Sequence, residues 1–340
     1  GQTLRRQPRL YSAEKMSQVR ITIFKIRMYC YDSPADGGGV PVRSLRFPPT
    51  ASVERPGPRL LQRSFIIFPG ISKIGERKLW DAGILSWDDL ASRPEDVLRE
   101  VLGAAPRKAL RCIDPYRERL AAGDVAFFQA RLPAAERFRA LSEFGDSICY
   151  LDIETTGSHR QPERITVIGC YDGVRPTVFR LDSNINDCMD WLTQFRVIVT
   201  YNGAGFDLPM IEKFFSRKLH PHLHIDLRPV FTAVGYKQGL KKLEIAFGLS
   251  RGEELDGADG WEAIKLWRKY SVGGSRKALE KLIRYNMADV AHLEPLLRIA
   301  INLNIRTRNL PFDELTEITD FSTQTMLDLA VEAAGARSDE

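Results

Sequence analysis

The chain has 340 residues, 44% of them hydrophobic and 27% charged, and a formal net charge of +5 at pH 7. These proportions are typical of a globular protein of about two domains, and they exclude a fibrous or wholly disordered chain. No apolar run approaches the roughly 20 residues that span a bilayer, and no secretory signal is apparent, so we expect no membrane contact. The cysteines form no CxxC pair, which favours reduced thiols in the cytoplasm over disulfides or a zinc cage: Cys30, Cys112, Cys149, Cys170 and Cys188.

Residues 1–62 are predicted to form a basic and largely disordered arm. Residues 1–63 contain twelve Lys or Arg against four Asp or Glu, and glycine and proline interrupt them densely. Only Val19–Tyr31 has the apolar content of a strand. The charge excess favours a polyanionic partner, although a solvated tail or an untranslated upstream segment would have the same composition.

A helical unit with a linker is predicted over residues 63–145, and it opens with a glycine turn. The turn, Gly70-x4-Gly75, precedes an amphipathic helix that Gly83 ends. This pattern resembles a helix-hairpin-helix element, in which the turn presents backbone N–H groups to a nucleic-acid phosphate. The resemblance implies substrate contacts at Gly70, Lys73 and Gly75, because free N–H groups at a helix start attract anions. A single unit of this kind could equally serve only to pack on its neighbour.

Further helices are expected on both sides of a main domain at residues 146–305. One spans Trp87–Leu102 and begins at Ser86 or Asp88, either of which can cap it. Two more span residues 109–122 and 126–144 and link the helical unit to the main domain. Residues 306–340 are predicted to be a C-terminal tail that carries one helix, Thr323–Ala334.

Two acids interrupt a strand at the start of the main domain. Residues 147–153 are mostly apolar or aromatic, but Asp152 and Glu154 occur in and directly after this run. Side chains of a strand alternate, so both carboxylates leave the same face. Two like charges on a buried strand repel each other and resist desolvation, and a hard divalent cation with oxygen ligands would neutralise them. The alternative is a strand end whose acids simply face water.

The rest of the main domain alternates between strands and helices. Further strands are expected at residues 165–171, 177–181 and 196–201, and Asp172-Gly173 signals a hairpin between the first two of these. Helices are expected over residues 184–195, from Asp207 to Lys218, and over Leu240–Phe247. This order predicts an α/β fold in which helices flank a mixed sheet.

Two more acids follow in positions where such folds carry their sites. Asp207 comes after a loop of small residues that ends a strand, although an aspartate there could simply cap the helix. Asp289 lies in a long amphipathic helix predicted over Ser275–Asn302, on one face with Tyr285. An aspartate beside an apolar stripe is unfavourable unless it has a partner.

Taken in chain order, these elements resemble the three exonuclease motifs of the DEDD superfamily in its tyrosine branch. The histidine branch would place a histidine at Arg284. Residues of about 65–300 are also similar to the ribonuclease H-like exonucleases of the YprB type, which implies a ribonuclease H-like fold. The resemblance is carried by Asp152-x-Glu154, Asn202 to Asp207, Tyr285-x3-Asp289, the hairpin unit, and Leu255-Asp256-Gly257 with Trp267.

The resemblance also implies roles for individual residues. It makes Tyr285 the residue that orients an attacking water, and it gives Asp226, which follows a strand, a supporting role at most. Asn202 and Phe206 would shape a cleft around the terminal nucleotide, and Lys241 and Lys242 would contact phosphates. Two Mg²⁺ or Mn²⁺ ions would be held by four carboxylates, those of Asp152, Glu154, Asp207 and Asp289.

The expected function is metal-dependent 3′–5′ hydrolysis of a single-stranded nucleic-acid end. Metal and phosphate chemistry serve DNA and RNA alike, and DNA is taken as the favoured substrate. A monomer is favoured, although the sequence leaves the oligomeric state open. One alternative is a non-catalytic nucleic-acid-binding module, and another is an acid-pair enzyme such as a glycosidase. The alternating His220, His222 and His224 lack a further soft ligand, so we do not expect a zinc site there.

Overall fold

The computed structural model describes residues 60–103, 106–157, 163–252, 255, 260–315 and 322–335. These residues belong to one compact unit, Pro48–Glu340. Most of the predicted arm lies outside the described residues, together with its strand Val19–Tyr31 and with Asp256 and Gly257. Leu60 and Leu61, at the end of that arm, are buried in the short 3-10 helix η2 (Leu60–Arg63). The domain boundaries stay a prediction.

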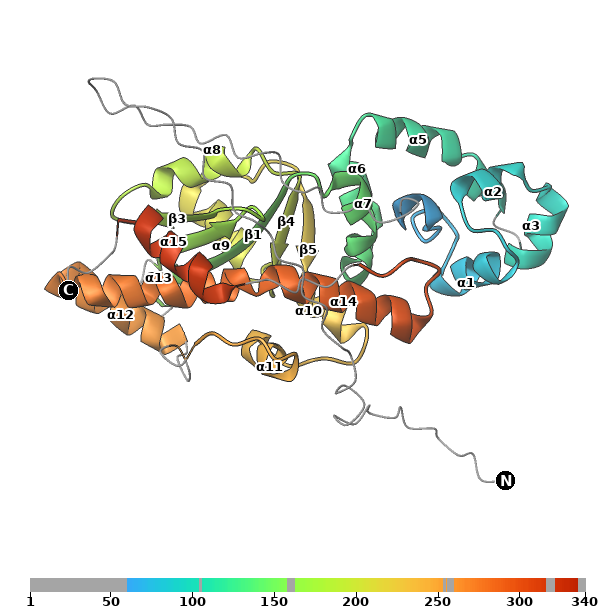
Figure 1. The fold of residues 1–340 in the computed structure, drawn as a ribbon. Coiled ribbons are helices and arrows are strands. Elements are labelled where there is room, and N and C mark those ends of the chain that lie inside the picture. Colours follow the sequence, from blue (N-terminus) through green and yellow to red (C-terminus); the bar gives the residue numbers. More distant parts are fainter. Residues whose placement is uncertain are drawn as a thin grey trace, which may run out of the picture. The chain divides into compact units, whose positions relative to one another are not determined.

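A mixed sheet of five strands forms the centre of the main domain (Figure 1). Its order is β3-β2-β1-β4-β5, in which β1 pairs antiparallel with β2 and parallel with β4. The β2–β3 pair is antiparallel, as the hairpin signal predicts, and the β4–β5 pair is parallel. The mixed sheet is therefore confirmed, with a fifth strand added to those predicted. The strands are β1 (Ile148–Thr155), β2 (Ile165–Tyr171), β3 (Pro176–Arg180), β4 (Val197–Thr200) and β5 (Leu223–Asp226).

Both faces of the sheet are buried, which explains why its strands are almost continuously apolar. On one face, Cys149, Leu151 and Ile153 pack with the 3-10 helix η4 (Ile185–Asp187), α8 (Cys188–Leu192) and α9 (Asp207–Phe215). Tyr150, the alternate residue of β1, packs in the other apolar core, on the opposite face. The helices after β5 that contribute to this second core are α10 (Leu227–Thr232), α11 (Leu240–Ala246), α12 (Gly260–Gly273), α13 (Arg276–Ala291), α14 (Leu293–Arg308) and α15 (Thr323–Ala333).

The predicted single helix Ser275–Asn302 is wrong, because α13 and α14 are separate helices that meet at His292. Pro295 explains the break. A proline has no N–H to donate to the carbonyl four residues earlier, so it is tolerated in the first turn of α14 but not inside a continuous helix. The helix that begins at Asp207 is also shorter than predicted, because Ser216 ends it in a left-handed conformation at φ 49°.

The N-terminal region is helical as predicted, but its helices are shorter than the sequence pattern indicates. Arg93-Pro94 divides the predicted helix Trp87–Leu102, and Pro133 divides the one over residues 126–144. Ser86 begins α2 with a capping box that Asp89, not Asp88, completes. The helices are α1 (Lys73–Asp81), α2 (Trp87–Ser92), α3 (Glu95–Leu102), α4 (Pro106–Leu110), α5 (Ile113–Ala121), α6 (Val125–Arg131), η3 (Ala134–Ala140) and α7 (Leu141–Phe144).

A buried ion cluster connects this helical region with the end of α14. The Arg139 guanidinium donates to both carboxylate oxygens of Glu76, at 2.8 and 2.9 Å, and both side chains are fully or almost fully buried. Glu136 lies 2.7 Å from Arg308 of α14 and also pairs with Arg139. The helical region and the main domain therefore share a charged core. No helix of the described residues has the length and apolar character needed to cross a bilayer.

Gly169 allows α13 to approach the sheet, and this contact is testable. Gly169 on β2 is the register partner of Asp152, and a Cβ added there would lie 2.1 Å from Oδ1 of the buried Asn286. We expect Gly169→Ala to lower the free energy of unfolding by about 1–3 kcal/mol, as overpacking of a core does. Chemical denaturation measures this change. Gly260→Ala is the control, because its Cβ would meet no atom within 4 Å, and equal stability of the two variants would contradict the contact.

Candidate metal centre

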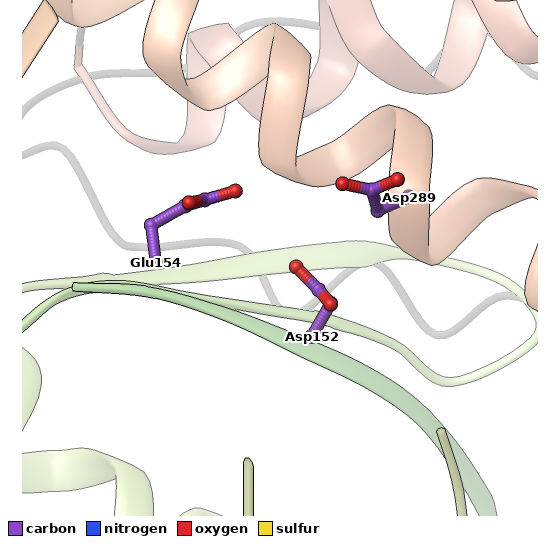
Figure 2. A group of neighbouring side chains, drawn as sticks. All are labelled: Asp152, Glu154 and Asp289. Atoms are coloured by element: carbon purple, nitrogen blue, oxygen red, sulfur yellow. The ribbon is translucent and has the colours of Figure 1, made fainter. Parts of the chain in front are cut away.

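Three carboxylates converge between the sheet and a helix. Asp152 and Glu154 leave the same face of β1, as the alternation predicts, and Asp289 points toward them from α13 (Figure 2). One oxygen from each of the three side chains can be chosen so that all lie within 4.8 Å of one another. Residues more than a hundred positions apart in sequence therefore form one cluster of hard oxygen donors.

The environment of this cluster disfavours its negative charge. Burial, followed by the charges of the neighbouring acids, raises the pKa of Asp152 and of Glu154 well above the usual range. Burial also raises the pKa of Asp289, although the charge of Arg251 opposes this effect. Three buried carboxylates at this spacing fit a divalent cation, which prefers oxygen ligands and would relieve their repulsion. The acidic cluster is thus consistent with the divalent metal site typical of the fold described above.

Asp207 borders the cluster but is not one of the three converging acids. It is the first residue of α9, only 4% exposed, and its charge raises the pKa of Asp152 and Glu154. The pairing of β1 with β4 ends at Tyr150, and the carboxylate of Asp207 accepts a hydrogen bond from the backbone N–H of Ile153 farther along β1. Burial raises the pKa of Asp207 to about 7. The N-cap alternative does not hold, because Phe206 takes the cap position and no side chain caps the helix.

The loop between β4 and α9 is held in place by Asp226 at the end of β5. Its carboxylate accepts the N–H of Asn202 at 2.7 Å and that of Ala204 at 3.2 Å. Asn202 adopts φ 65°, a left-handed conformation that asparagine tolerates. The side-chain oxygen of Asn202 accepts a hydrogen bond from Nη1 of Arg228 at 2.6 Å. Asp226 therefore positions the loop that leads to Asp207, which is the supporting role expected for it.

Tyr285 lies one helical turn before Asp289 and is almost fully buried. Lys241 of α11 donates to its phenol oxygen at 2.9 Å. Burial, and then the charge of Asp289, raises the pKa of the phenol. Tyr285 consequently keeps its proton near neutral pH, and its oxygen accepts the hydrogen bond from Lys241.

Three polar neighbours of the cluster were missed from the sequence. Arg251 donates to Asp289, and its Nε and Nη2 lie 2.7 Å from the two carboxylate oxygens of Glu244. Nδ1 of His292 lies 2.9 Å from the same carboxylate of Glu244. No periodic signal marks Arg251, because it lies in an irregular segment after α11.

Asn286, next to Tyr285 in the sequence, is a fourth missed residue. Its Nδ2 donates to Oδ2 of Asp152 at 2.9 Å, so it links α13 directly to β1. A polar residue within the apolar stripe of a helix is the signal that could have identified it. This hydrogen bond holds one carboxylate oxygen of Asp152 in place, and its donor is an uncharged amide group.

An open cleft of about 410 Å³ lies beside the acids, and its wall includes cations as well as carboxylates. Both Asn202 and Lys241, two of the predicted substrate residues, line it. Phe206 is 43% exposed at the start of α9, and Lys242 is exposed on α11, but neither lines this cleft. The lining residues are Asp152, Tyr201, Asn202, Arg228, Lys237, Gly239, Leu240, Lys241 and Asp289.

Two of the three predicted phosphate contacts of the helical unit, Lys73 and Gly75, already have partners within the protein. Gly70 takes φ 85°, as a turn glycine does, but Gly75 lies inside α1 and its N–H donates to Oγ of Ser72 at 3.2 Å. The ammonium group of Lys73 lies 2.6 Å from Glu136. Phosphate binding at this turn stays a prediction, and it would have to compete with these contacts.

The histidines His220, His222 and His224 do not form a metal cluster within the part of the chain that the structure describes. His224 is buried, with its Nε2 2.9 Å from Oγ1 of Thr200, and Nδ1 of His222 lies 2.7 Å from the carbonyl oxygen of His220. Their hydrogen bonds therefore stabilise β5 and the turn before it.

The raised pKa of Asp207 predicts that the stability of the metal-free protein depends on pH. An acid whose pKa is raised to about 7 by folding from 3.8 binds its proton more tightly in the folded state. Its stabilising contribution is therefore complete below about pH 4 and is lost as the pH rises to about 7. We expect Asp207→Asn, which keeps an oxygen acceptor for Ile153, to raise the unfolding temperature more at pH 8 than at pH 5. Thermal unfolding in EDTA measures this, and a pH-independent difference would contradict the assignment.

The comparisons with known proteins agree with this geometry. Residues 149–301 match the family described as the RNase H superfamily, and the match covers all five strands and extends into α14. No curated protein and no solved structure is significantly similar to the chain. The ribonuclease H-like α/β fold, with helices on both sides of its mixed sheet and a helical region before it, is confirmed. Residues 149–301 are therefore a domain of the RNase H superfamily.

Proposed function

We propose that this chain is a metal-dependent nuclease that removes nucleotides in the 3′–5′ direction from single-stranded nucleic acid, with DNA favoured over RNA. A domain of the RNase H superfamily suggests the processing of nucleic acid. The observation that carries the proposal is the convergence of Asp152, Glu154 and Asp289 beside a cleft that is also lined by cationic side chains. The 3′–5′ direction and the need for an end follow from the resemblance to the DEDD motifs.

The acids provide the ligands for the proposed cofactor, two Mg²⁺ or Mn²⁺ ions. Asp152, Glu154 and Asp289 would hold the ions, and Asp207 borders them. When bound, such ions lower the pKa of water and stabilise the charge that develops on a phosphodiester. The same donor set without an ion would carry several buried negative charges, which explains why the pKa values of these acids are raised.

The other side chains of the site have roles that do not depend on the ions. Arg228, Lys237 and Lys241 line the cleft and would attract the phosphates of a strand. Tyr285, kept protonated by burial, can donate its hydroxyl proton and orient a water or a phosphate oxygen. Asn202 is fixed by Arg228 and lines the same cleft, where it would contact the terminal nucleotide.

The first test removes single charges from the acidic cluster. Asp152→Asn and Asp289→Asn should each lower cleavage about a thousandfold, because the loss of roughly 4 kcal/mol of charge stabilisation corresponds to that factor. End-labelled single-stranded DNA and RNA, incubated with Mn²⁺ or EDTA, report the activity, and a circular strand tests the need for an end. Asp146→Asn is the control, because that carboxylate is exposed and lies outside the cluster.

Two results would decide against the proposal. Undiminished cleavage by both variants would refute the site. Salt-dependent binding of nucleic acid without any cleavage in Mn²⁺ would instead support the non-catalytic binding module.

The second test addresses the cationic wall of the cleft. Lys237→Ala should weaken the binding of single-stranded DNA uniformly across sequences, because a lysine–phosphate contact carries no base information. It should also reduce the slope of log affinity against log salt by about 0.7, as expected for one phosphate contact on a single strand. Fluorescence anisotropy in the background of Asp152→Asn avoids cleavage. Lys218→Ala is the matched control, because Lys218 is highly exposed and does not line the cleft, and an equal slope for both would exclude the contact.

A further inference from the structure

Helix α12 carries an exposed stripe of one tryptophan and three cations, which we call the α12 stripe. Trp261, Lys265, Arg268 and Lys269 recur at helical spacing, so their side chains share one face of the helix. All four residues are exposed, and Trp261, although large and apolar, is 55% exposed. Trp267 faces the other way, into the core, and is only 8% exposed. The core-facing side of α12 therefore packs on the protein, and the stripe faces outward.

The stripe belongs to a region of concentrated positive charge. Residues 64–340 carry a net charge of −3, because the whole chain carries +5 and residues 1–63 carry +8. Residues 260–284, which form α12 and the first half of α13, contain seven Lys or Arg against two Glu and so carry +5. The remainder of residues 64–340 therefore carries −8. A local excess of this size attracts a polyanion.

The cations of the stripe are little used within the protein. Arg268 and Lys269 form no ion pair with any residue that the structure describes. Lys265 lies 3.8 Å from Glu262, and the same glutamate lies 4.0 Å from Lys281. Ion pairs that are this long and this exposed contribute little to stability. The charge of the stripe is therefore available to an external anion.

The stripe begins beside the acidic cluster. Gly157 is three residues past Glu154 on the chain that leaves β1, and a Cβ added to Gly157 would lie 2.6 Å from Cδ1 of Ile264. The beginning of α12 therefore lies against the end of β1, on the side of Glu154. Asp152 lines the cleft described above, whereas Glu154 does not. A strand with its last nucleotide in the cleft can thus pass the acids and continue beyond Glu154 onto α12.

We propose that the α12 stripe binds the single strand upstream of its terminal nucleotide, with a base stacked on Trp261 and phosphates at Lys265, Arg268 and Lys269. Aromatic rings stack on any base and cations follow the backbone, so these contacts select single strands but no sequence. From Trp261 to Lys269 the helix rises about 12 Å, which matches about three stacked nucleotides at roughly 3.4 Å each. This inference rests on the proposed function, because it takes the acidic cluster as the place where the strand is cut.

The test of Trp261 compares the affinities for a short and a long strand. Fluorescence anisotropy with 5′-labelled DNA in the background of Asp152→Asn avoids cleavage. This parent should bind an octanucleotide about a hundredfold more tightly than a trinucleotide, because only the longer strand reaches α12. Trp261→Ala should lower this ratio to about tenfold, as expected for the loss of one stacked base, and Trp261→Phe, which keeps a ring, should retain most of it. Leu329→Ala is the matched control, because Leu329 is a comparably exposed apolar residue of α15 and should leave the ratio unchanged.

The test of the cations measures the salt dependence of octanucleotide binding. The double variant Arg268→Ala/Lys269→Ala should reduce the slope of log affinity against log salt by about 1.4, since one phosphate contact on a single strand contributes about 0.7. Lys218→Ala removes an exposed charge elsewhere on the protein and should leave the slope unchanged.

The outcomes separate this inference from the function on which it rests. If Trp261→Ala keeps the ratio of the parent and the double variant keeps its slope, while wild type cleaves, the stripe is refuted and the nuclease stands. If wild type neither binds nor cleaves single strands, both fail. Should the variants instead change only the sedimentation of the protein, the stripe is an interface between copies of the chain and the inference is wrong. If circular dichroism shows that Trp261→Ala does not fold, the double variant decides, and an unchanged slope refutes the inference.

Discussion

The repulsion between acids on one buried face of β1 is the constraint on which the rest of the site depends. β1 is the central strand of the sheet, and its neighbours cover it on both faces, so Asp152 and Glu154 are only partly exposed and are incompletely hydrated. Asp289 adds a third carboxylate from α13. The surrounding structure compensates with a neutral donor from Asn286 and a positive charge from Arg251. A bound divalent cation would relieve the repulsion that remains, which supports the proposed metal site.

The backbone around the acids departs from regular strand pairing, and these departures bring the acidic side chains together. Gly169 removes a side chain where Asn286 must pass between α13 and β2, and Asn202 takes a left-handed conformation where the chain leaves β4. Asp226 and Asp207 then accept backbone N–H groups that no strand satisfies. Acids of this site therefore serve twice, as charged groups and as hydrogen-bond acceptors, which ties the geometry of the site to the stability of the sheet.

Local sequence patterns predicted the elements well and their lengths less well. The apolar runs predicted β1, β2 and β3, because strands that are buried on both faces are apolar almost throughout. The hairpin signal then separated β2 from β3. Helical periodicity persists across a helix break, so Pro94, Pro133 and Pro295 divided helices that the apolar pattern had joined. At each of these prolines the missing N–H group outweighs the helical periodicity of the neighbouring apolar residues.

The sequence alone determined the fold class and the shared face of Asp152 and Glu154, because strand alternation decides which side chains point the same way. The resemblance to a known family, not a local pattern, joined Asp289 and Asp207 to them, and Asp207 only borders the cluster. The sequence could not determine which distant groups surround these acids. Arg251, Glu244 and His292 carry no local pattern, and only the tertiary contacts among them and Asp289 bring their charges together. The same holds for Arg228 and Lys237 in the cleft. Electrostatic environment depends on distances in space, which sequence separation does not encode, and so only the tertiary structure decided it.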